Sequence, residues 1–361
     1  MRYLFFTNTP AHVHLYRHAI DRLEAAGHEV LVLGRDYGCT KALLEFYDLP
    51  HEMYGACETT KFSLVREVPG HFARIFRETL RYGPDLVFGI GSYAAPAGAL
   101  ARAPVVLITD SEPVAFDQFV SRALADAILT PYTFRKNLGG KHFQFRGFKE
   151  TAYLHPDVFE ADDGVREELG LAPDERFAIV RLNAFGSHHD LNHGGFTAEQ
   201  RRDLVSRLAE DVTVFVSDEG DEFDPETVGA RPYDAHPGYL HDALAESSLL
   251  VTDTQTMATE AALLGTPTIR SNTFVGEDDM GNFIELEDRG LIYNTDDFED
   301  VLATAEEYVT DESIQRRWRD RRAEYVGDLD DLTEVIVDVA ANMGRVEPVS
   351  TLTPWASPDH S

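Results

Sequence analysis

Short apolar runs alternate with longer amphipathic runs along almost the whole chain, and this alternation limits the fold more than any other feature. The short runs have the length of buried strands, and the amphipathic runs have the spacing of helices. Strand and helix repeated in this order predict a mostly parallel sheet covered by helices, and therefore the α/β class. The predicted strands are residues 3–7, 30–34, 86–90, 105–109, 127–130, 178–182, 212–217, 249–252 and 268–270.

The alternation lapses between residues 147 and 172, where the acidic run 160–163 and the nearby Pro156 are typical of a linker. A chain of 361 residues is long enough for two domains of ordinary size. We therefore predict one Rossmann-like domain over residues 1–155 and a second over residues 156–345. Helices are expected at 298–309 and 313–343, and residues 346–361, which contain several prolines, are expected to form a flexible tail.

The charge balance excludes several classes of partner. Asp and Glu number 63 against 32 Lys and Arg, a formal net charge of −31. Such a surface repels nucleic-acid phosphates and anionic membranes. No apolar run reaches the roughly 18 to 20 residues of a membrane span, and no signal peptide is evident. With only Cys39 and Cys57 available for pairing, we expect a cytoplasmic protein without a disulfide framework.

Residues 249–270, with the sequence LLVTDTQTMATEAALLGTPTIR, contain the most informative pattern. A strand, a polar turn and a small-residue helix follow one another closely. The turn places Asp253, Thr254, Gln255 and Thr256 at the N-terminus of the helix, where backbone N–H groups without partners favour a diphosphate. Glu260 lies one turn further on the same face and could accept hydrogen bonds from ribose hydroxyls. Alternatively, Thr256 only caps its helix and Glu260 is solvated.

This segment resembles the donor-binding element of GT-B nucleotide-sugar enzymes, and particularly that of the UDP-N-acetylglucosamine 2-epimerase group. In that group a Thr/Ser-Asp-Ser-Gly-Gly turn precedes a Glu-bearing helix and a Leu-Gly-x-Pro turn. The matching residues here are 252–256, Glu260 and 264–267. The first half is also similar, from Pro84-Asp85-Leu86-Val87 to the acidic Asp110-Ser111-Glu112 turn. The resemblance covers most of residues 1–310 and implies two Rossmann-like domains facing each other across a cleft.

The chain resembles the uncharacterised archaeal relatives of this group still more closely. Their Gly-x-Lys-Glu-x-x-Tyr-Leu motif is matched by Gly147, Lys149, Glu150, Tyr153 and Leu154. This resemblance implies the fold more securely than it implies a reaction.

The chain departs from the epimerase pattern at positions that carry chemistry. Where that pattern has an acidic residue after the Pro-Asp-Leu-Val strand, this chain has Gly91, Ser92 and Tyr93. Epimerisation eliminates and re-adds the nucleotide and moves a proton at the sugar carbon, so it needs such groups. Glycosyl transfer needs less: stabilisation of the leaving diphosphate and one base for the acceptor hydroxyl.

Three residues of the first half are candidates for catalysis. Glu112 follows the strand 105–109 and could act as the base, although it could instead cap the helix that starts beside Pro113. His12 and His14 follow the first strand, and either could act as the base or hold the acceptor. The His-x-His spacing has no third ligand nearby in the sequence, so we predict no metal site.

Three residues of the second half are further candidates for binding. Arg181 and Arg270 each end a strand and could contact the diphosphate; the alternative for both is an ion pair. His188 belongs to the polar run 188–193, which contacts sugar or phosphate if it is not simply a surface loop.

No phosphate-binding GxxxxGK[ST], no GxGxxG after the first strand and no GxSxG occurs in the sequence, which argues against kinases, NAD enzymes and common hydrolases. We therefore predict a glycosyltransferase that moves a sugar from a nucleoside-diphosphate sugar, preferably a UDP-sugar, to a glycan or lipid-linked acceptor in polysaccharide or glycoprotein assembly. The alternatives are a sugar-nucleotide 2-epimerase and a non-catalytic nucleotide-sugar-binding protein. No resident cofactor is expected, and a homodimer is compatible with the sequence.

The acidic surface also predicts a dependence on salt. Only five of the 32 basic residues are Lys, at positions 41, 61, 136, 141 and 149. Repulsion among the excess carboxylates is screened over a few Å in concentrated salt, as in the cytoplasm of a halophilic archaeon. We expect circular dichroism to show loss of helix at low ionic strength and its recovery at molar salt. Indifference of the spectrum to salt would contradict this adaptation.

Overall fold

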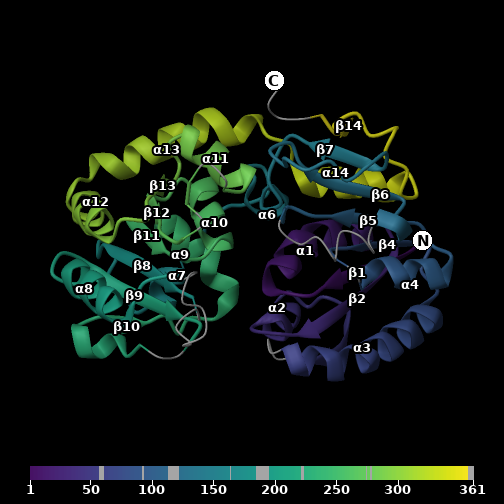
Figure 1. Cartoon of the computed structure of the whole chain (residues 1–361), viewed down its shortest axis with the longest axis horizontal. Coiled ribbons are helices and arrows are strands. Elements are labelled where there is room, and N and C mark those ends of the chain that lie inside the picture. Colours follow the sequence, from purple (N-terminus) through teal and green to yellow (C-terminus); the bar gives the residue numbers. More distant parts are fainter. Residues whose placement is uncertain are drawn as a thin grey trace. The chain divides into compact units, whose positions relative to one another are not determined.

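The computed structural model of the chain describes residues 1–56, 61–91, 93–112, 122–162, 164–183, 195–220, 223–273, 275–276 and 279–356, with the backbone alone for residues 61–66. These residues form two compact units (Figure 1). Unit 1 contains Met1–Val158 and the chain from Leu329 onward, whereas unit 2 contains Phe159–Asp328. From the sequence, all of residues 156–345 are predicted to belong to the second domain. In the structure, the part of this range from Leu329 onward belongs to unit 1 instead.

Unit 1 is built on a sheet that has eight strands among the described residues, in the order β14-β7-β6-β5-β4-β1-β2-β3. All neighbouring strands are parallel except β14, which pairs antiparallel with β7. The strand order reverses between β1 and β4, because β2 and β3 lie on one side of β1 while β4 to β7 lie on the other. The strands are β1 (Arg2–Thr7), β2 (Glu29–Asp36), β3 (His51–Ala56), β4 (Leu86–Gly89), β5 (Val105–Ile108), β6 (Ala127–Pro131), β7 (His142–Phe145) and β14 (Thr353–Pro354).

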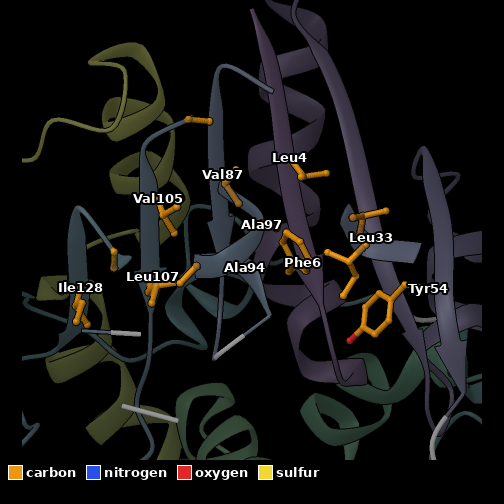
Figure 2. Packing of buried hydrophobic residues seen from close by; sticks show 14 of the residues in the cluster. Leu4, Phe6, Leu33, Tyr54, Val87, Ala94, Ala97, Val105, Leu107 and Ile128 are labelled. Carbon is orange, nitrogen blue, oxygen red and sulfur yellow. The ribbon is translucent and has the colours of Figure 1, made fainter. Parts of the chain in front are cut away.

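The core of unit 1 lies between this sheet and its helices (Figure 2). Leu4 and Phe6 of β1 pack with Val87, Val105 and other strand residues, all of them buried. The small residues of α4 (Ala94–Ala101) let this helix approach the sheet closely, since a Cβ on Gly98 would lie 2.2 Å from Val105 Cγ2. The other helices of unit 1 are α1 (Pro10–Ala25), α2 (Thr40–Phe46), α3 (Lys61–Tyr82), α6 (Thr151–Leu154) and α14 (Leu332–Ala341).

Unit 2 is built on a parallel sheet whose described strands have the order β10-β9-β8-β11-β12-β13. Here the strand order reverses between β8 and β11. The strands are β8 (Phe177–Leu182), β9 (Thr213–Asp218), β10 (Arg231–Pro232), β11 (Leu249–Thr252), β12 (Thr268–Arg270) and β13 (Tyr293–Asn294). The helices are α7 (Val165–Glu168), α8 (Ala198–Leu208), α9 (Leu240–Glu246), α10 (Thr256–Leu264), α11 (Gly281–Asp288), α12 (Phe298–Thr310) and α13 (Ser313–Tyr325).

The C-terminal part of the chain differs most from the sequence prediction. The expected helix 313–343 is divided, because α13 ends at Tyr325 and α14 starts anew after Asp331, whose carboxylate accepts a hydrogen bond from the Thr333 N–H at 2.8 Å. Part of the expected flexible tail is packed instead. Val346, Val349 and Leu352 are buried, and Trp355 donates through its indole Nε1 to the Phe134 carbonyl at 3.0 Å.

The strands and helices before the C-terminal part agree with the predicted α/β class, because both sheets are parallel apart from β14. The start of the helix expected beside Pro113 falls on residues 113–121, which lie outside those described. Among the described helices, none combines the length and the apolar character needed to span a bilayer.

Candidate functional site

In open α/β sheets, ligands bind beyond the carboxyl ends of the strands where the strand order reverses. In unit 2 this point lies between β8 and β11, whose ends are adjacent because Arg181 and Thr252 are partners in register. The chain leaves β8 at Asn183 and leaves β11 at Asp253. The turn that the sequence pattern singled out therefore lies at the position where a ligand site is expected in unit 2.

The turn after β11 leads directly into α10. Thr252 Oγ1 accepts a hydrogen bond from the Thr254 N–H at 2.9 Å and lies 2.8 Å from Thr254 Oγ1. Gln255 is exposed, Thr254 and Thr256 are half-buried, and no side chain caps the first turn of α10. The first N–H groups of a helix have no intrahelical acceptor, so this end of α10 offers donors and a partial positive charge to an anion.

Asp253 occupies a different environment from its neighbours in the turn. It is only 1% exposed, and its Oδ1 accepts a hydrogen bond from the Asn183 N–H at 2.8 Å. Burial raises the pKa of the Asp253 carboxyl to about 6, although backbone N–H groups and the Arg201 charge act in the opposite direction. Asp253 thus binds the end of β8 through its carboxylate, and its contact with a ligand stays a prediction.

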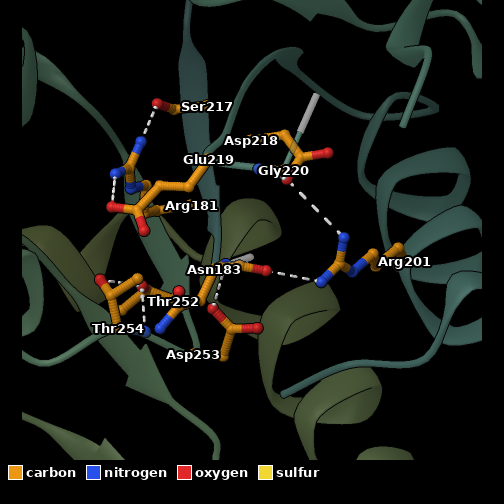
Figure 3. A network of polar contacts seen from close by, with 10 residues as sticks. All are labelled: Arg181, Asn183, Arg201, Ser217, Asp218, Glu219, Gly220, Thr252, Asp253 and Thr254. Carbon is orange, nitrogen blue, oxygen red and sulfur yellow. Dashed lines mark hydrogen bonds and ion pairs between the residues drawn. The ribbon is translucent and has the colours of Figure 1, made fainter. Parts of the chain in front are cut away.

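The cation predicted at the end of β8 is partly accessible. The Arg181 guanidinium donates to Ser217 Oγ at 2.6 Å and forms an ion pair with Glu219, both at the end of β9 (Figure 3). Its side chain is 20% exposed. Arg181 is in register with Thr252 and forms an ion pair, as one of the two alternatives for it expected. Its contact with a diphosphate stays a prediction.

Arg270 ends the neighbouring strand β12 but lies in the core of unit 2. Its guanidinium is fully buried, donates to Asp279 Oδ2 at 2.6 Å and lies 3.7 Å from the centre of the Phe283 ring. A guanidinium enclosed by a carboxylate and an aromatic ring stabilises the fold around it and does not face solvent. Arg270 thus forms the ion pair that was the alternative in the sequence analysis, and its contact with a diphosphate stays a prediction.

Glu260 lies on α10, one turn after Thr256 as expected, but it is buried. Its Oε1 is 3.1 Å from His241 Nε2, a residue of α9 that is equally buried. The solvated alternative does not apply, since the side chain is only 4% exposed. Binding of ribose by Glu260 remains a prediction. It requires the carboxylate to contact His241 and accept hydrogen bonds from the sugar hydroxyls at the same time.

The corresponding reversal point of unit 1 lies between β1 and β4. Asn8 follows β1 and donates through Nδ2 to the Ile90 carbonyl, just beyond β4, at 2.9 Å. The Asn8 N–H donates to His12 Nδ1 at 3.1 Å. Burial first, and the nearby charges of Lys149 and Arg35 next, lower the pKa of His12 to about 3. His12 is therefore neutral with its proton on Nε2, which suits a hydrogen-bond donor better than a base.

The other two catalytic candidates of unit 1 have partners. His14 is buried, with Nδ1 3.4 Å from the Tyr47 hydroxyl and its ring against that of Tyr153. Glu112 accepts a hydrogen bond from the Arg135 N–H at 3.1 Å. The proposed catalytic roles of both residues remain predictions. His188 lies outside the described residues.

Two charged clusters were not identified as sites from the sequence. Lys149 Nζ, only 8% exposed as a side chain, lies 2.8 Å from Asp110 Oδ2 at the end of β5. In unit 2, Arg201 of α8 is buried and bonds to the chain at both Asn183 and Phe196. The sequence signals for the first were the Gly-x-Lys-Glu motif and the acidic Asp110-Ser111-Glu112 turn. Helix α8 offered no signal, because Arg201 stands in an ordinary charged helix. The described residues contain no group of three or more side chains that could hold a metal ion.

Two grooves lie away from these residues. One of about 600 Å³ is formed in unit 2 by β13, α12 and α13, and one of about 260 Å³ lies beside β3 and α3 in unit 1. Neither groove has a predicted binding or catalytic residue among its described lining residues.

The raised pKa of Asp253 predicts a pH dependence of stability. In the unfolded chain this carboxyl loses its proton near its usual pKa of 3.8, whereas the folded protein retains it to about pH 6. Between these values the unfolded state releases its proton first as pH rises. The contribution of Asp253 to the free energy of unfolding therefore falls, by at most about 1.4 kcal/mol per pH unit, and becomes constant above pH 6.

Asp253→Asn removes this titration and still offers an oxygen to the Asn183 N–H. Urea unfolding of both proteins from pH 4 to 7 should show the parent losing stability relative to the variant as pH rises. Parallel pH profiles would show that Asp253 does not titrate in this range.

Comparison with known proteins places the fold. Solved structures that align with this chain include UDP-GlcNAc 2-epimerase from Neisseria meningitidis bound to UDP-GlcNAc, with 11% identity, a TM-score of 0.62 and coverage of 95% of this chain and 99% of that one. The S. aureus MnaA–UDP co-structure aligns with 13% identity, a TM-score of 0.63 and coverage of 95% and 97%. The spinosyn forosaminyltransferase SpnP aligns with 13% identity, a TM-score of 0.65 and coverage of 96% and 100%. With the two largely parallel sheets, these alignments confirm the predicted GT-B fold class.

Sequence comparison identifies the family. The uncharacterized protein MJ0665 of Methanocaldococcus jannaschii is 25% identical over 275 residues, which are 73% of this chain and 79% of that protein. Residues 3–345 match the family described as "Protein of unknown function (DUF354)". The predicted relationship to archaeal proteins of this superfamily is thereby confirmed, and the chain belongs to the DUF354 family.

Proposed function

We propose that this protein binds a nucleoside-diphosphate sugar at the carboxyl ends of β8 and β11 and transfers the sugar to an acceptor. The observation that carries the proposal is the uncapped N-terminus of α10, which stands at the reversal point of the unit 2 sheet beside the hydroxyls of Thr254 and Thr256. The diphosphate would accept hydrogen bonds from these hydroxyls and from the first N–H groups of the helix. The GT-B fold supports the ligand class by analogy, since relatives of that fold have been solved with UDP and UDP-GlcNAc.

Arg181 is the cation of this proposal, because it is in register with Thr252 and its side chain is partly exposed. It would contact the diphosphate if its ion pair with Glu219 opened or if the ligand bound beside the pair. Such a contact would stabilise the charge that develops on the leaving nucleotide during transfer. We propose a UDP-sugar as the donor and a glycan or lipid-linked molecule as the acceptor.

Transfer is proposed ahead of epimerisation because of unit 1. The strand β4 is followed by Ile90 and Gly91, and Tyr93 packs its ring against Tyr54 and Phe72, so this turn presents no carboxylate among its described residues. His12 is held neutral and aimed as a donor. The observation that keeps epimerisation as a second candidate is Asp110 with Lys149, an ionisable pair at the end of β5 that could move a proton.

The donor site can be tested with Thr256→Val, which removes the hydroxyl while preserving the shape of the side chain. Calorimetric titration with UDP and a UDP-sugar should show binding to the parent and roughly tenfold weaker binding to the variant, since a hydrogen bond to a charged group contributes about 1.5 kcal/mol or more. Thr310→Val is the matched control, because Thr310 is an exposed threonine at the end of α12 that bonds only within its own helix. Absence of nucleotide binding by the parent protein would refute the proposed function.

Incubation with UDP-GlcNAc in D₂O, without an acceptor, distinguishes the two reactions. An epimerase exchanges the proton at the sugar carbon with solvent, whereas a transferase does not. We expect no deuterium at C2 of the recovered sugar nucleotide by NMR and mass spectrometry. Its appearance there would favour epimerisation over transfer.

A further inference from the structure

Asn183, the residue that follows β8, is hydrogen-bonded on two sides by buried charged side chains (Figure 3). The Asn183 N–H donates to Asp253 Oδ1 at 2.8 Å, and the Asn183 carbonyl accepts from Arg201 Nη2 at 2.8 Å. Asp253 comes from the end of β11 and Arg201 from α8, so three elements meet at one backbone residue. Both backbone groups of Asn183 are satisfied by charged partners, which form stronger hydrogen bonds than neutral ones.

The same two side chains also fix the chain where it approaches α8. Arg201 Nε donates to the Phe196 carbonyl at 3.0 Å. Gly195 packs directly against the other carboxylate oxygen of Asp253, since a Cβ on Gly195 would lie only 1.8 Å from Asp253 Oδ2. Asn183 and Phe196 are therefore held by one guanidinium, and the carboxylate that binds Asn183 is enclosed by Gly195.

Asp253 passes this constraint on to the α10 turn because it is the residue immediately before Thr254. Its own carbonyl accepts a hydrogen bond from Asn272 Nδ2, beyond β12, at 3.2 Å. The start of the turn is thus fixed through its side chain to β8 and through its backbone to β12. Arg201 in turn forms an ion pair with Asp218 at the end of β9, with Nη1 3.7 Å from Oδ1. All four central strands of unit 2 contribute to the position of one turn.

We propose that Arg201 and Asp253 are positioning residues for the nucleotide-sugar site, which hold the ends of β8 and β11 so that Thr254, Thr256 and the first N–H groups of α10 face the diphosphate in a fixed geometry. This inference rests on the proposed function. Neither side chain contacts the ligand in this arrangement; both act through backbone. Burying charges costs free energy that a well-packed apolar pair would not, so stability alone is a poor reason for them. Preorganised donors, by contrast, are what an anion site gains from such a frame.

The test compares variants by UDP affinity and by hydrogen exchange in the segment 254–257. Asp253→Ala and Arg201→Met should each weaken UDP binding by about tenfold or more and accelerate exchange in this segment, because the donors lose their fixed geometry. Asp253→Asn should restore most of the affinity, since its amide oxygen can still accept from Asn183. Arg207→Met is the matched control: it removes an exposed arginine of the same helix and should change neither measurement.

Gly195→Ala provides a second route if the alanine or methionine variants do not fold. It removes no polar group but forces the Asp253 carboxylate to move, and it should likewise weaken UDP binding. Variants that lose stability while UDP affinity and exchange at 254–257 stay at parental values would overturn the positioning role. If the parent protein does not bind UDP, the proposed function fails. Hydrogen exchange in residues 254–257 of the variants then shows by itself whether Arg201 and Asp253 hold the turn.

Discussion

Each unit depends on a polar side chain that ties together the two strands at which the order of its sheet reverses. In unit 1 this is Asn8, which reaches from the end of β1 to the carbonyl of Ile90 beyond β4. In unit 2 it is Asp253, which reaches from the end of β11 to the N–H of Asn183 beyond β8. Chains that leave adjacent parallel strands toward opposite sides expose backbone groups at this point, and those groups must be satisfied if they are buried. A short side chain that satisfies them holds the two strand ends together at this point.

Three of the 32 cations of this acidic chain are buried beside strand ends, where they organise backbone and core. Arg201 donates to two carbonyls, Arg270 lies between a carboxylate and a ring, and Lys149 pairs with Asp110. All three are buried. A cation at the surface of such a chain is surrounded by many competing carboxylates, whereas a buried one has a single defined partner and a stronger interaction with it. The two arginines predicted to contact the diphosphate differ in this respect. Arg181 pairs with Glu219 and is partly exposed, whereas Arg270 is buried between Asp279 and the Phe283 ring.

The sequence predicts those parts of the fold that depend on neighbours along the chain. The strand and turn from 249 to 256 and the small-residue helix α10 are local patterns, and the structure has them where they were expected. The strand β7 was missed because His142 and Gln144 are polar; they are buried only because Thr130 and the Tyr132 carbonyl lie beside them. The contacts of Arg201 and the pairing of Glu260 with His241 join residues from different elements, so no local pattern encodes them. For the same reason the sequence suggested residues for a donor site without indicating which of them face solvent.

The return of the chain to unit 1 after unit 2 has a consequence for the order in which the protein can fold. Unit 2 is one continuous segment, Phe159–Asp328, and all its strands are available once that segment has left the ribosome. Unit 1 is not: the Tyr3 hydroxyl in its first strand donates to the carbonyl of Ala340 in α14, and Thr333 of the same helix bonds to Ala152. The first strand to be synthesised is thus covered in part by α14, which is one of the last elements to be synthesised. During synthesis unit 2 can complete its core first, while unit 1 keeps an apolar face exposed until α14 arrives.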